Sequence, residues 1–226
     1  MIDGIAGSGK TTVIQAMYEA LIASGKTCYR MQDWKGDHPP AFSEIPDVDV
    51  LFTFEPSRTW IGRAIRDELS HIKDYNGISH AHAFALDREI QYRRLILPAL
   101  AAGKIIVQDR GVSSSIVYQP IMENSLSLEE VYNLPGNALA IENAPNHFVH
   151  IDCPIDRIAD RIRSRTDESK GVYIDVEYLR HVDARYRESW FRELFESRGT
   201  QMHSIDTGGT LEESRERAAT MIRQLV

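Results

Sequence analysis

A glycine-rich stretch near the start of the chain has the residue types needed to hold phosphate groups. It matches the pattern G-x-x-x-x-G-K-[ST] in full, with Gly4, Ile5, Ala6, Gly7, Ser8, Gly9, Lys10 and Thr11. Glycines let backbone N–H groups turn toward phosphate oxygens, and the dipole of a following helix adds to the attraction. Lys10 can reach the β and γ phosphates, and the Thr11 hydroxyl is placed to bind Mg²⁺. The stretch predicts a nucleoside triphosphate site; the alternative is a glycine-rich turn with an exposed lysine.

An acidic and a basic residue follow one of the apolar runs. Residues 105–108 read IIVQ, which is typical of a buried strand, and Asp109 and Arg110 come next. Beside a phosphate loop, an Asp at a strand end typically binds Mg²⁺ directly or through water. Arg110 could bridge donor and acceptor phosphates, and the alternative is a structural ion pair that caps the strand. Thr11 and Asp109 are therefore the candidate metal ligands, and Lys10 and Arg110 are candidate catalytic residues.

Arginines also cluster after another apolar run. Residues 51–66 read LFTFEPSRTWIGRAIR, so the expected strand ends at a Glu-Pro pair and is followed by Arg58, Arg63 and Arg66. Either an anion site near the carboxyl end of the strand or a solvated loop-to-helix junction would account for them.

The order of the expected elements indicates an α/β fold, because short apolar runs alternate with longer helical patterns. We expect strands over residues 27–31, 50–54, 104–108, 147–152 and 202–205. We expect helices over residues 10–24, 59–71, 79–102, 128–142, 154–165, 176–198 and 211–226. Only Met1, Ile2 and Asp3 precede the phosphate loop, whereas a strand of about five residues is usual there. The first strand is therefore expected to be clipped, or the start to have been assigned too late.

The composition is ordinary for a globular protein. The chain has 226 residues, of which 42% are hydrophobic and 26% charged, and its formal net charge is −7. This length fits one domain over residues 1–226, and the charge argues against binding a nucleic-acid polymer. Cys28 and Cys153 share no metal or redox spacing, which favours a reducing cytoplasm. No apolar stretch approaches the ~18 residues of a membrane-spanning helix, and no signal peptide is recognisable.

These motifs together resemble the thymidylate kinase family of nucleoside monophosphate kinases. The matching pieces, in order, are GSGKTT (7–12), EPSRTWIGRAIR (55–66), FALDR (84–88), DRGVSSSIVYQ (109–119) and DRIADRIRSR (156–165). The resemblance implies a three-layer P-loop kinase fold, with a five-stranded, mainly parallel sheet, helices on both faces and a mobile arginine-rich lid at about residues 154–174. It also implies ATP-dependent phosphorylation of a deoxynucleoside monophosphate, dTMP to dTDP, in dTTP biosynthesis. Mg²⁺, a homodimer and ATP contacts that include Thr12 follow from the same resemblance.

The resemblance assigns roles on the acceptor side. Phe84 and Arg88 are spaced i, i+4 and share one helix face. The family uses this aromatic to stack on thymine and this arginine to hydrogen-bond a base carbonyl. From the residues alone, Phe84 is as well explained as part of the core. The implied substrate-binding residues are Glu55, Arg58, Phe84, Arg88, Arg110, Ser114, Ser115, Tyr118 and Gln119.

The segment after Arg110 would line the deoxyribose. In the family the tyrosine, here Tyr118, crowds the 2′ position and disfavours ribonucleotides. Helix N-capping is the alternative role for the serines at 113–115.

Arginines at 157, 161 and 165 recur every four residues and would form one positive stripe on a helix, to which Arg163 adds. A solvated face is the usual explanation of such a stretch, whereas the resemblance makes it the lid that closes over the triphosphate. Because the phosphate loop has no arginine, the resemblance assigns the catalytic arginine to Arg161 or Arg165 and ranks Arg163 behind them. Adenine is expected near residues 206–209.

Three positions depart from the family pattern. Ala6 stands where an Asp usually contacts the sugar 3′-hydroxyl, and Phe54 where an Arg usually grips the acceptor phosphate. Gly111 stands where an aromatic or imidazole ring usually follows the Asp-Arg pair. Arg58, four residues after Phe54, is the candidate replacement for the missing arginine.

Two other functions fit part of the pattern. One is a deoxynucleoside kinase that phosphorylates a hydroxyl and uses Glu55 as its base. The other is a nucleotide-binding regulatory protein that has lost acceptor turnover, which Ala6 and Phe54 would suit. A nucleic-acid motor is disfavoured, because neither a basic groove signature nor an extra domain is recognisable.

Overall fold

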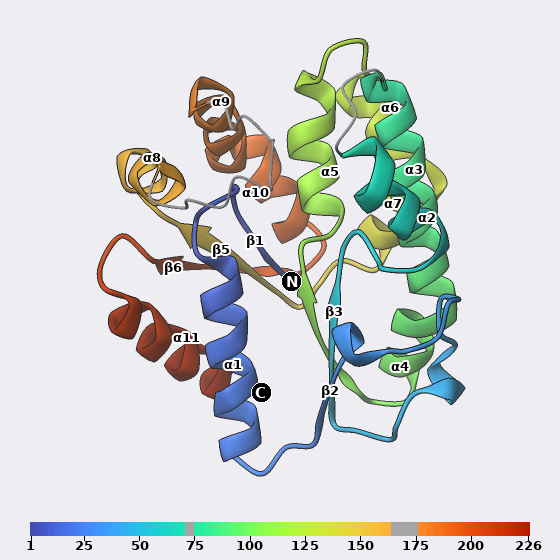
Figure 1. The fold of residues 1–226 in the computed structure, drawn as a ribbon, viewed down its shortest axis with the longest axis vertical. Helices are drawn as coiled ribbons and strands as arrows, with labels where there is room; N and C mark the ends of the chain where they lie inside the picture. Colours follow the sequence, from blue (N-terminus) through green and yellow to red (C-terminus); the bar gives the residue numbers. More distant parts are fainter. Residues whose placement is uncertain (71–74, 164–175) are drawn as a thin grey trace. The chain divides into compact units, whose positions relative to one another are not determined.

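In the computed structural model, the chain folds into two compact units (Figure 1). The terminal unit consists of residues 2–25 and 145–226, and the middle unit of residues 26–144 together with Met1. The structure describes residues 1–70, 75–163 and 176–226.

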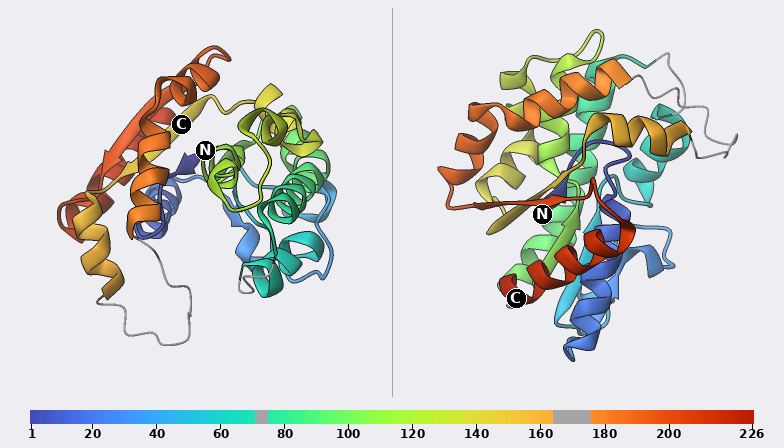
Figure 2. Two further views of the ribbon diagram at one scale, coloured as in Figure 1. Left: turned by 90° about the horizontal axis from the view of Figure 1, so that it is seen from above. Right: turned by 90° about the vertical axis from the view of Figure 1, so that its left-hand side faces the viewer.

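The terminal unit is built on three parallel strands. β5 (His147–Asp152) lies between β1 (Ile2–Asp3) and β6 (Gln201–Asp206) and pairs with both. The phosphate loop follows β1 and leads into the first helix. The helices of this unit are α1 (Lys10–Ala23), α8 (Ile155–Arg163), α9 (Val176–Arg187), α10 (Ser189–Glu196) and α11 (Leu211–Leu225). α1 and α11 lie side by side on one face of these strands, and α9 and α10 cover the other (Figure 2).

Aromatic side chains fill the core between β5 and α10. The ring of Phe148 lies 5.4 Å from that of Phe191 and 5.4 Å from that of Phe195, measured between centroids. All three side chains are fully buried. Buried aromatic residues contribute a large apolar area each, so this cluster fixes α10 on the sheet and leaves the carboxyl end of β5 free for polar residues.

The middle unit also has three parallel strands. β3 (Val50–Phe54) lies between β2 (Cys28–Arg30) and β4 (Ile105–Asp109). β3 is buried from Val50 to Thr53, as expected for a parallel strand covered on both faces. The helical segments are η1 (Met31–Asp33), η2 (Phe42–Glu44), α2 (Trp60–Ala64), η3 (Ile65–Leu69), α3 (Gly77–Gln91), η4 (Tyr92–Ile96), α4 (Leu97–Ala101), α5 (Val112–Tyr118), η5 (Gln119–Ile121), α6 (Leu128–Asn133) and α7 (Pro135–Glu142).

The expectation of parallel strands flanked by helices is confirmed, but the expectation of five strands is wrong. The described residues form six strands, because β1 exists although it is only two residues long. So short a strand carries no periodic pattern of its own. The phosphate loop that follows it was the signal from which a clipped first strand was offered as one of two explanations. No helix within residues 1–70, 75–163 and 176–226 is long and apolar enough to span a bilayer.

Two of the expected helices are each divided in the structure. The helix predicted over 128–142 breaks at Leu134, whose ψ of 135 is extended. Pro135 follows, and a residue before proline is driven out of the helical region. The helix predicted over 176–198 breaks at Glu188, whose ψ of 147 is also extended, although Ser189 and not a proline follows it.

Gly136 allows α7 to pack directly against α3, which generates a stability prediction. A Cβ at Gly136 would lie 1.8 Å from the Ala85 carbonyl oxygen. We expect Gly136→Ala to lower the free energy of unfolding by about 1–3 kcal/mol, because the two helix backbones must move apart. Urea denaturation measures the change. The control Glu142→Ala, exposed on the same helix, should stay within about 0.5 kcal/mol; equal stability of the two variants would contradict the packing.

Candidate active site

The phosphate loop lies in the terminal unit between β1 and α1, and α1 begins at Lys10 as the motif requires. Gly4, Gly7 and Gly9 have φ values of 153, 80 and 96, which residues with a side chain adopt only with strain. A Cβ on Gly4 would also lie 2.7 Å from the carbonyl oxygen of Ile151 on β5. Glycine is therefore required at Gly4 by both conformation and close approach.

Lys10 is buried against this loop. Its Nζ donates to the carbonyl oxygens of Gly4 and Ile5, each at 2.7 Å. Thr11 is exposed at the start of α1, and Thr12 is partly exposed. The lysine ammonium is thus held by the loop backbone, and a phosphate group would compete with those carbonyls for its N–H groups.

Sequence reasoning missed two residues that hold the loop in place. The fully buried Asp3 carboxylate accepts a hydrogen bond from the Gly4 N–H at 2.7 Å. The Thr207 hydroxyl, at the end of β6, lies 2.6 Å from the Ser8 carbonyl oxygen and 3.0 Å from that of Asp152. The only sequence signal for Asp3 was its position directly before the first glycine of the loop. Thr207 falls within residues 206–209, the segment that was expected near adenine.

Arg161 is the lid arginine that the structure brings to the loop. Its Nη2 donates to the Thr207 carbonyl oxygen at 2.6 Å, and its Nη1 lies 3.3 Å from the Cys153 sulfur. A Cβ built on Gly9 would lie 3.6 Å from the same Nη1. Arg161 therefore lies beside the phosphate loop.

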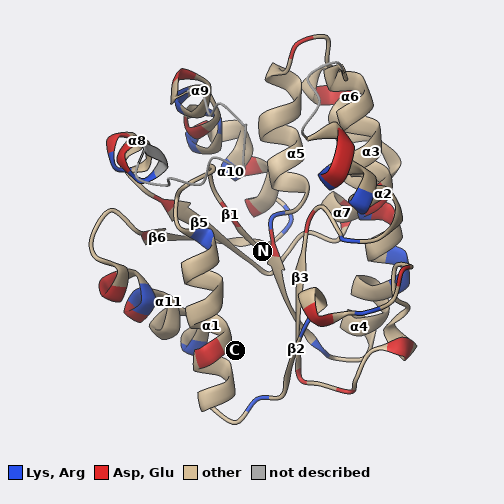
Figure 3. Cartoon of the chain, viewed as in Figure 1, with Lys and Arg blue, Asp and Glu red and all other residues tan. Residues whose placement is uncertain are grey.

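The other arginines of the expected lid are not placed beside the phosphate loop by the described structure. α8 carries both acidic and basic residues (Figure 3), and Arg157 is exposed on it. Arg165 and the part of the expected lid over 164–174 lie outside the described residues, as does the side chain of Arg163.

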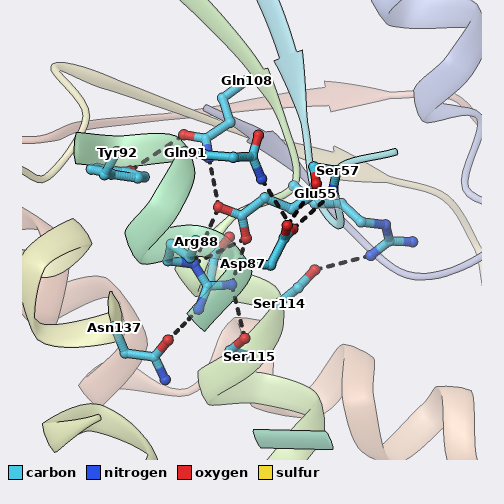
Figure 4. A network of polar contacts seen from close by, with 12 residues as sticks. Glu55, Ser57, Asp87, Arg88, Gln91, Tyr92, Gln108, Ser114, Ser115 and Asn137 are labelled. Atoms are coloured by element: carbon cyan, nitrogen blue, oxygen red, sulfur yellow. Dashed lines mark hydrogen bonds and ion pairs between the residues drawn. The ribbon is translucent and has the colours of Figure 1, made fainter. Parts of the chain in front are cut away.

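In the middle unit, Glu55 and Arg88 form a buried ion pair (Figure 4). The Arg88 side chain is 1% exposed and that of Glu55 is 3% exposed. Arg88 Nε lies 3.0 Å from Glu55 Oε2 and Nη2 lies 2.5 Å from the same oxygen, while Gln108 Nε2 donates to Oε1 at 2.9 Å. Buried charges are tolerated only when they are paired and hydrogen-bonded, and both conditions are met.

Further side chains complete the Arg88 network. Arg88 Nη2 donates to Ser115 Oγ at 2.9 Å, and Nη1 donates to Asn137 Oδ1. Gln119 Nε2 lies 3.1 Å from the same Ser115 Oγ, and Asn137 Nδ2 donates to the Val131 carbonyl oxygen at 2.6 Å. Arg88 thus ties α3 to β3, α5 and α7. Its predicted hydrogen bond to a base carbonyl stays a prediction.

Asp87, next to Arg88, fixes the segment after Glu55. Its carboxylate accepts hydrogen bonds from the Ser57 N–H at 2.7 Å, the Ser57 hydroxyl at 2.6 Å and Gln91 Nε2 at 3.1 Å. Burial raises the pKa of Asp87, and the Ser57 hydrogen bonds oppose that shift. Gly62 allows the approach, since a Cβ there would lie 2.2 Å from Ser57 Oγ. Asp87 is part of the FALDR motif, but the motif does not indicate that Ser57 is its hydrogen-bond partner.

Cationic side chains gather at the carboxyl ends of β3 and β4. Burial lowers the pKa of Arg66, and the nearby charges of Arg58 and Arg110 lower it further. The carboxylates of Asp87 and Asp109 oppose this shift. The charges of Arg58 and Arg110 therefore both act on Arg66. Asp109, the residue before Arg110, lies opposite Phe54 in the β3–β4 register. Such a cluster can bind an anion of high charge density.

Arg110 has a left-handed backbone, with φ 63. A residue with a side chain rarely adopts this conformation, and such strain often marks a functional site. Its Nη1 lies 3.0 Å from Ser114 Oγ, and its Cζ lies 5.9 Å from the centroid of the Tyr118 ring. The structure therefore brings together Arg110, Ser114 and Tyr118; their roles in binding the acceptor stay predictions.

Two other predicted positions can be placed. Phe84 is partly buried on α3, one helical turn before Arg88. Gly111 faces Met1: a Cβ there would lie 2.4 Å from Met1 Cε. A ring at Gly111 would require the flexible Met1 side chain to shift.

Comparison with known proteins agrees with this geometry. The thymidylate kinase family model matches residues 43–218. The chain is 29% identical over 228 residues to a probable thymidylate kinase of Pyrococcus abyssi, covering 99% of this chain and 94% of that one. It is also 29% identical over 221 residues to a thymidylate kinase of Mesomycoplasma hyopneumoniae, covering 93% and 89%.

A solved structure shares the fold. The crystal structure of thymidylate kinase from Ehrlichia chaffeensis superposes with a TM-score of 0.63 at 20% identity, covering 100% of this chain and 96% of that one. Parallel strands flanked by helices, with a phosphate loop at the start of a helix, define an α/β P-loop protein. The chain belongs to the thymidylate kinase family.

The clamp on the phosphate loop generates a binding prediction. Thr207→Val keeps the side-chain shape but removes the hydroxyl that contacts the Ser8 carbonyl oxygen. We expect the affinity for ATP, measured by calorimetry, to fall by about five- to tenfold, because one buried hydrogen bond that shapes the loop is lost. The control Thr200→Val removes a comparable threonine hydrogen bond, to the Pro145 carbonyl oxygen at the opposite end of β6, and should leave the affinity unchanged. Equal affinities for wild type and Thr207→Val would contradict the clamp.

The buried ion pair generates a second prediction. Arg88→Met leaves the Glu55 carboxylate buried without its cation, so we expect the free energy of unfolding to fall by about 3–5 kcal/mol. The control Arg93→Met breaks the exposed pair with Glu89 on the same helical run and should cost at most about 1 kcal/mol. Adding Glu55→Leu to Arg88→Met should recover part of the loss. Denaturation curves that give Arg88→Met and Arg93→Met the same free energy of unfolding would contradict the role of the buried pair.

Proposed function

We propose that this chain is an ATP-dependent kinase that phosphorylates dTMP to dTDP in dTTP biosynthesis. The observation that carries the proposal is the position of three arginines at the carboxyl ends of two paired strands, which suits the phosphate of a monophosphate acceptor. Arg58 and Arg66 lie at the Phe54 ring, and Arg110 directly follows Asp109, which is opposite Phe54 in the β3–β4 register. The names of the relatives supply the identity of the acceptor. The proposal assigns ATP binding to the terminal unit and acceptor binding to the middle unit.

The chemistry requires positioning and charge neutralisation more than covalent help. An oxygen of the acceptor phosphate attacks the γ-phosphorus of ATP, and the bond from that phosphorus to the β,γ-bridging oxygen breaks, which releases ADP. A phosphate monoester is largely ionised at neutral pH, so no general base is needed. Lys10, Arg110 and Arg161, with Arg165 as the second lid candidate, are the residues proposed to balance the developing charge.

The candidate metal ligands fit Mg²⁺ by their chemistry. Thr11 offers an exposed hydroxyl and Asp109 a carboxylate, and Mg²⁺ prefers few protein oxygens together with water and substrate phosphates. In the part of the chain that the structure describes, no group of three or more His, Cys, Asp or Glu could hold a metal ion by itself. Bound Mg²⁺ would neutralise charge on the ATP phosphates.

One alternative function is disfavoured by the ion pair. A deoxynucleoside kinase would use Glu55 as the base that deprotonates a hydroxyl. Arg88 and Gln108 hydrogen-bond both carboxylate oxygens of Glu55, and accepting a proton would break that buried network.

We further propose, from the resemblance and the cysteine pattern, that residues 1–226 act as one domain in a cytoplasmic homodimer.

The proposal is tested with a panel of acceptors. Purified protein with ATP and Mg²⁺ is assayed with dTMP, dUMP, dCMP, ribothymidine monophosphate and thymidine, and the nucleotide products are resolved by chromatography. We expect dTDP from dTMP, with at least about tenfold lower kcat/KM for the other monophosphates and no product from thymidine. Phosphorylation of thymidine in preference to dTMP would establish the nucleoside kinase alternative.

The position of Arg161 beside the loop generates a kinetic prediction. Arg161→Ala removes a guanidinium that would stabilise the transferring phosphoryl group, so we expect kcat at saturating substrates to fall by about tenfold or more. The matched control is Arg157→Ala, one turn earlier and exposed on the same helix, whose kcat should stay within about threefold. If both variants stay within that range, Arg161 is not catalytic.

A further inference from the structure

The ring of Phe54 lies beside two guanidinium groups. Arg66 Cζ is 5.2 Å from the centroid of this ring, and Arg58 Cζ is 5.6 Å from it. Both distances are within the ~6 Å over which a cation is attracted to an aromatic face. Phe54 is the last residue of β3 and is partly buried, so its ring is fixed by the sheet.

Arg66 is fixed by hydrogen bonds as well as by the ring. Its Nε donates to the carbonyl oxygens of Pro56 and Ser57, each at 2.9 Å, and its Nη2 also donates to Pro56. Ser57 is itself held by Asp87. Arg66 is therefore an anchored, partly buried cation whose orientation is set by the segment that leaves β3.

Arg58 is held differently. Among the described residues, its side chain has no hydrogen bond or ion pair with another group, and its contact is with the Phe54 ring. Arg58 is exposed, so its guanidinium is not enclosed by the protein. Arg63, five residues later, is instead paired with Asp67 at 3.1 Å. The two exposed arginines of one segment thus differ: one is neutralised by a carboxylate and one is held on a ring.

Two guanidinium groups gathered at one ring repel each other. Both guanidinium groups lie at the Phe54 ring, and the charge of Arg58 contributes to the lowered pKa of Arg66. A dianion that bound both would remove this repulsion and accept several charge-assisted hydrogen bonds. A phosphate monoester has that charge at neutral pH, and its oxygens match the planar guanidinium.

We propose that Phe54 is a positioning residue for the acceptor: its ring holds Arg58 beside Arg66, so that the two arginines bind the phosphate of the monophosphate acceptor. This inference rests on the proposed function, because it takes the acceptor to be a nucleoside monophosphate. It adds Arg66 to the acceptor site and gives Phe54 a specific task. An aliphatic residue of the same size would keep the packing but would not attract the guanidinium groups.

The test compares Phe54→Leu with Phe54→Tyr. The first removes the aromatic ring, and the second retains it. We expect Phe54→Leu to raise the KM for dTMP by about five- to twentyfold, the range of a cation–π contact together with a misplaced phosphate ligand. Its KM for ATP should stay within about twofold, and Phe54→Tyr should match wild type within about twofold. Melting temperatures of both variants report whether the fold is retained.

A double variant separates positioning from simple packing. Arg58→Ala should raise the KM for dTMP about tenfold in wild type but only about twofold in the Phe54→Leu background, because the ring acts through that arginine. The control Arg63→Ala should leave this KM unchanged. Additive effects of Phe54→Leu and Arg58→Ala would overturn the inference.

The remaining outcomes distinguish this inference from the proposed function. If wild type turns over dTMP and Phe54→Leu has the wild-type KM, the positioning role is wrong and the kinase function stands. If Phe54→Leu raises the KM values for dTMP and ATP equally, the role of Phe54 is general packing and the inference also fails. If wild type forms no dTDP, the proposed function fails and this inference fails with it.

Discussion

The buried Glu55–Arg88 pair is the interaction on which the acceptor side of the structure depends. Moving two charges out of water is costly, and the cost is met only because Gln108, Ser115 and Asn137 supply the remaining hydrogen bonds. The same bonds join the carboxyl end of β3 to α3, α5 and α7. Removing one partner would leave a buried charge, so these elements can pack in only one arrangement.

The placement of the arginines follows from that arrangement. Asp87 adjoins Arg88 on α3 and holds Ser57, so the segment after β3 begins from a fixed point. Arg66 donates hydrogen bonds to carbonyl oxygens of that segment, and the ring of Phe54 lies beside the guanidinium groups of Arg58 and Arg66. A buried ion pair thereby sets the positions of the cationic side chains beside it. In the terminal unit, two side chains fix the backbone of the phosphate loop: the Asp3 carboxylate accepts a hydrogen bond from the Gly4 N–H, and the Thr207 hydroxyl contacts the Ser8 carbonyl oxygen.

Features carried by consecutive residues could be predicted from the sequence, and features that depend on distant partners could not. The phosphate loop and the strands β2 to β6 were predicted because their signals are local. The two-residue β1 was not counted, since it has no pattern. Phe84 and Arg88 were recognised as a pair, but Asn137 lies far from Arg88 in sequence and nothing local indicates their contact. Phe54 was read as the loss of an arginine; only the structure shows the two guanidinium groups at its ring.

The central claim is that the cationic cluster of the middle unit binds the phosphate of the acceptor. Calorimetric titration of the wild-type protein with dTMP and, separately, with thymidine tests it most directly, because the two ligands differ only in that phosphate. The account predicts that dTMP binds on the order of a hundredfold more tightly, as expected for charge-assisted hydrogen bonds to several arginines. Equal affinities for dTMP and thymidine would contradict it.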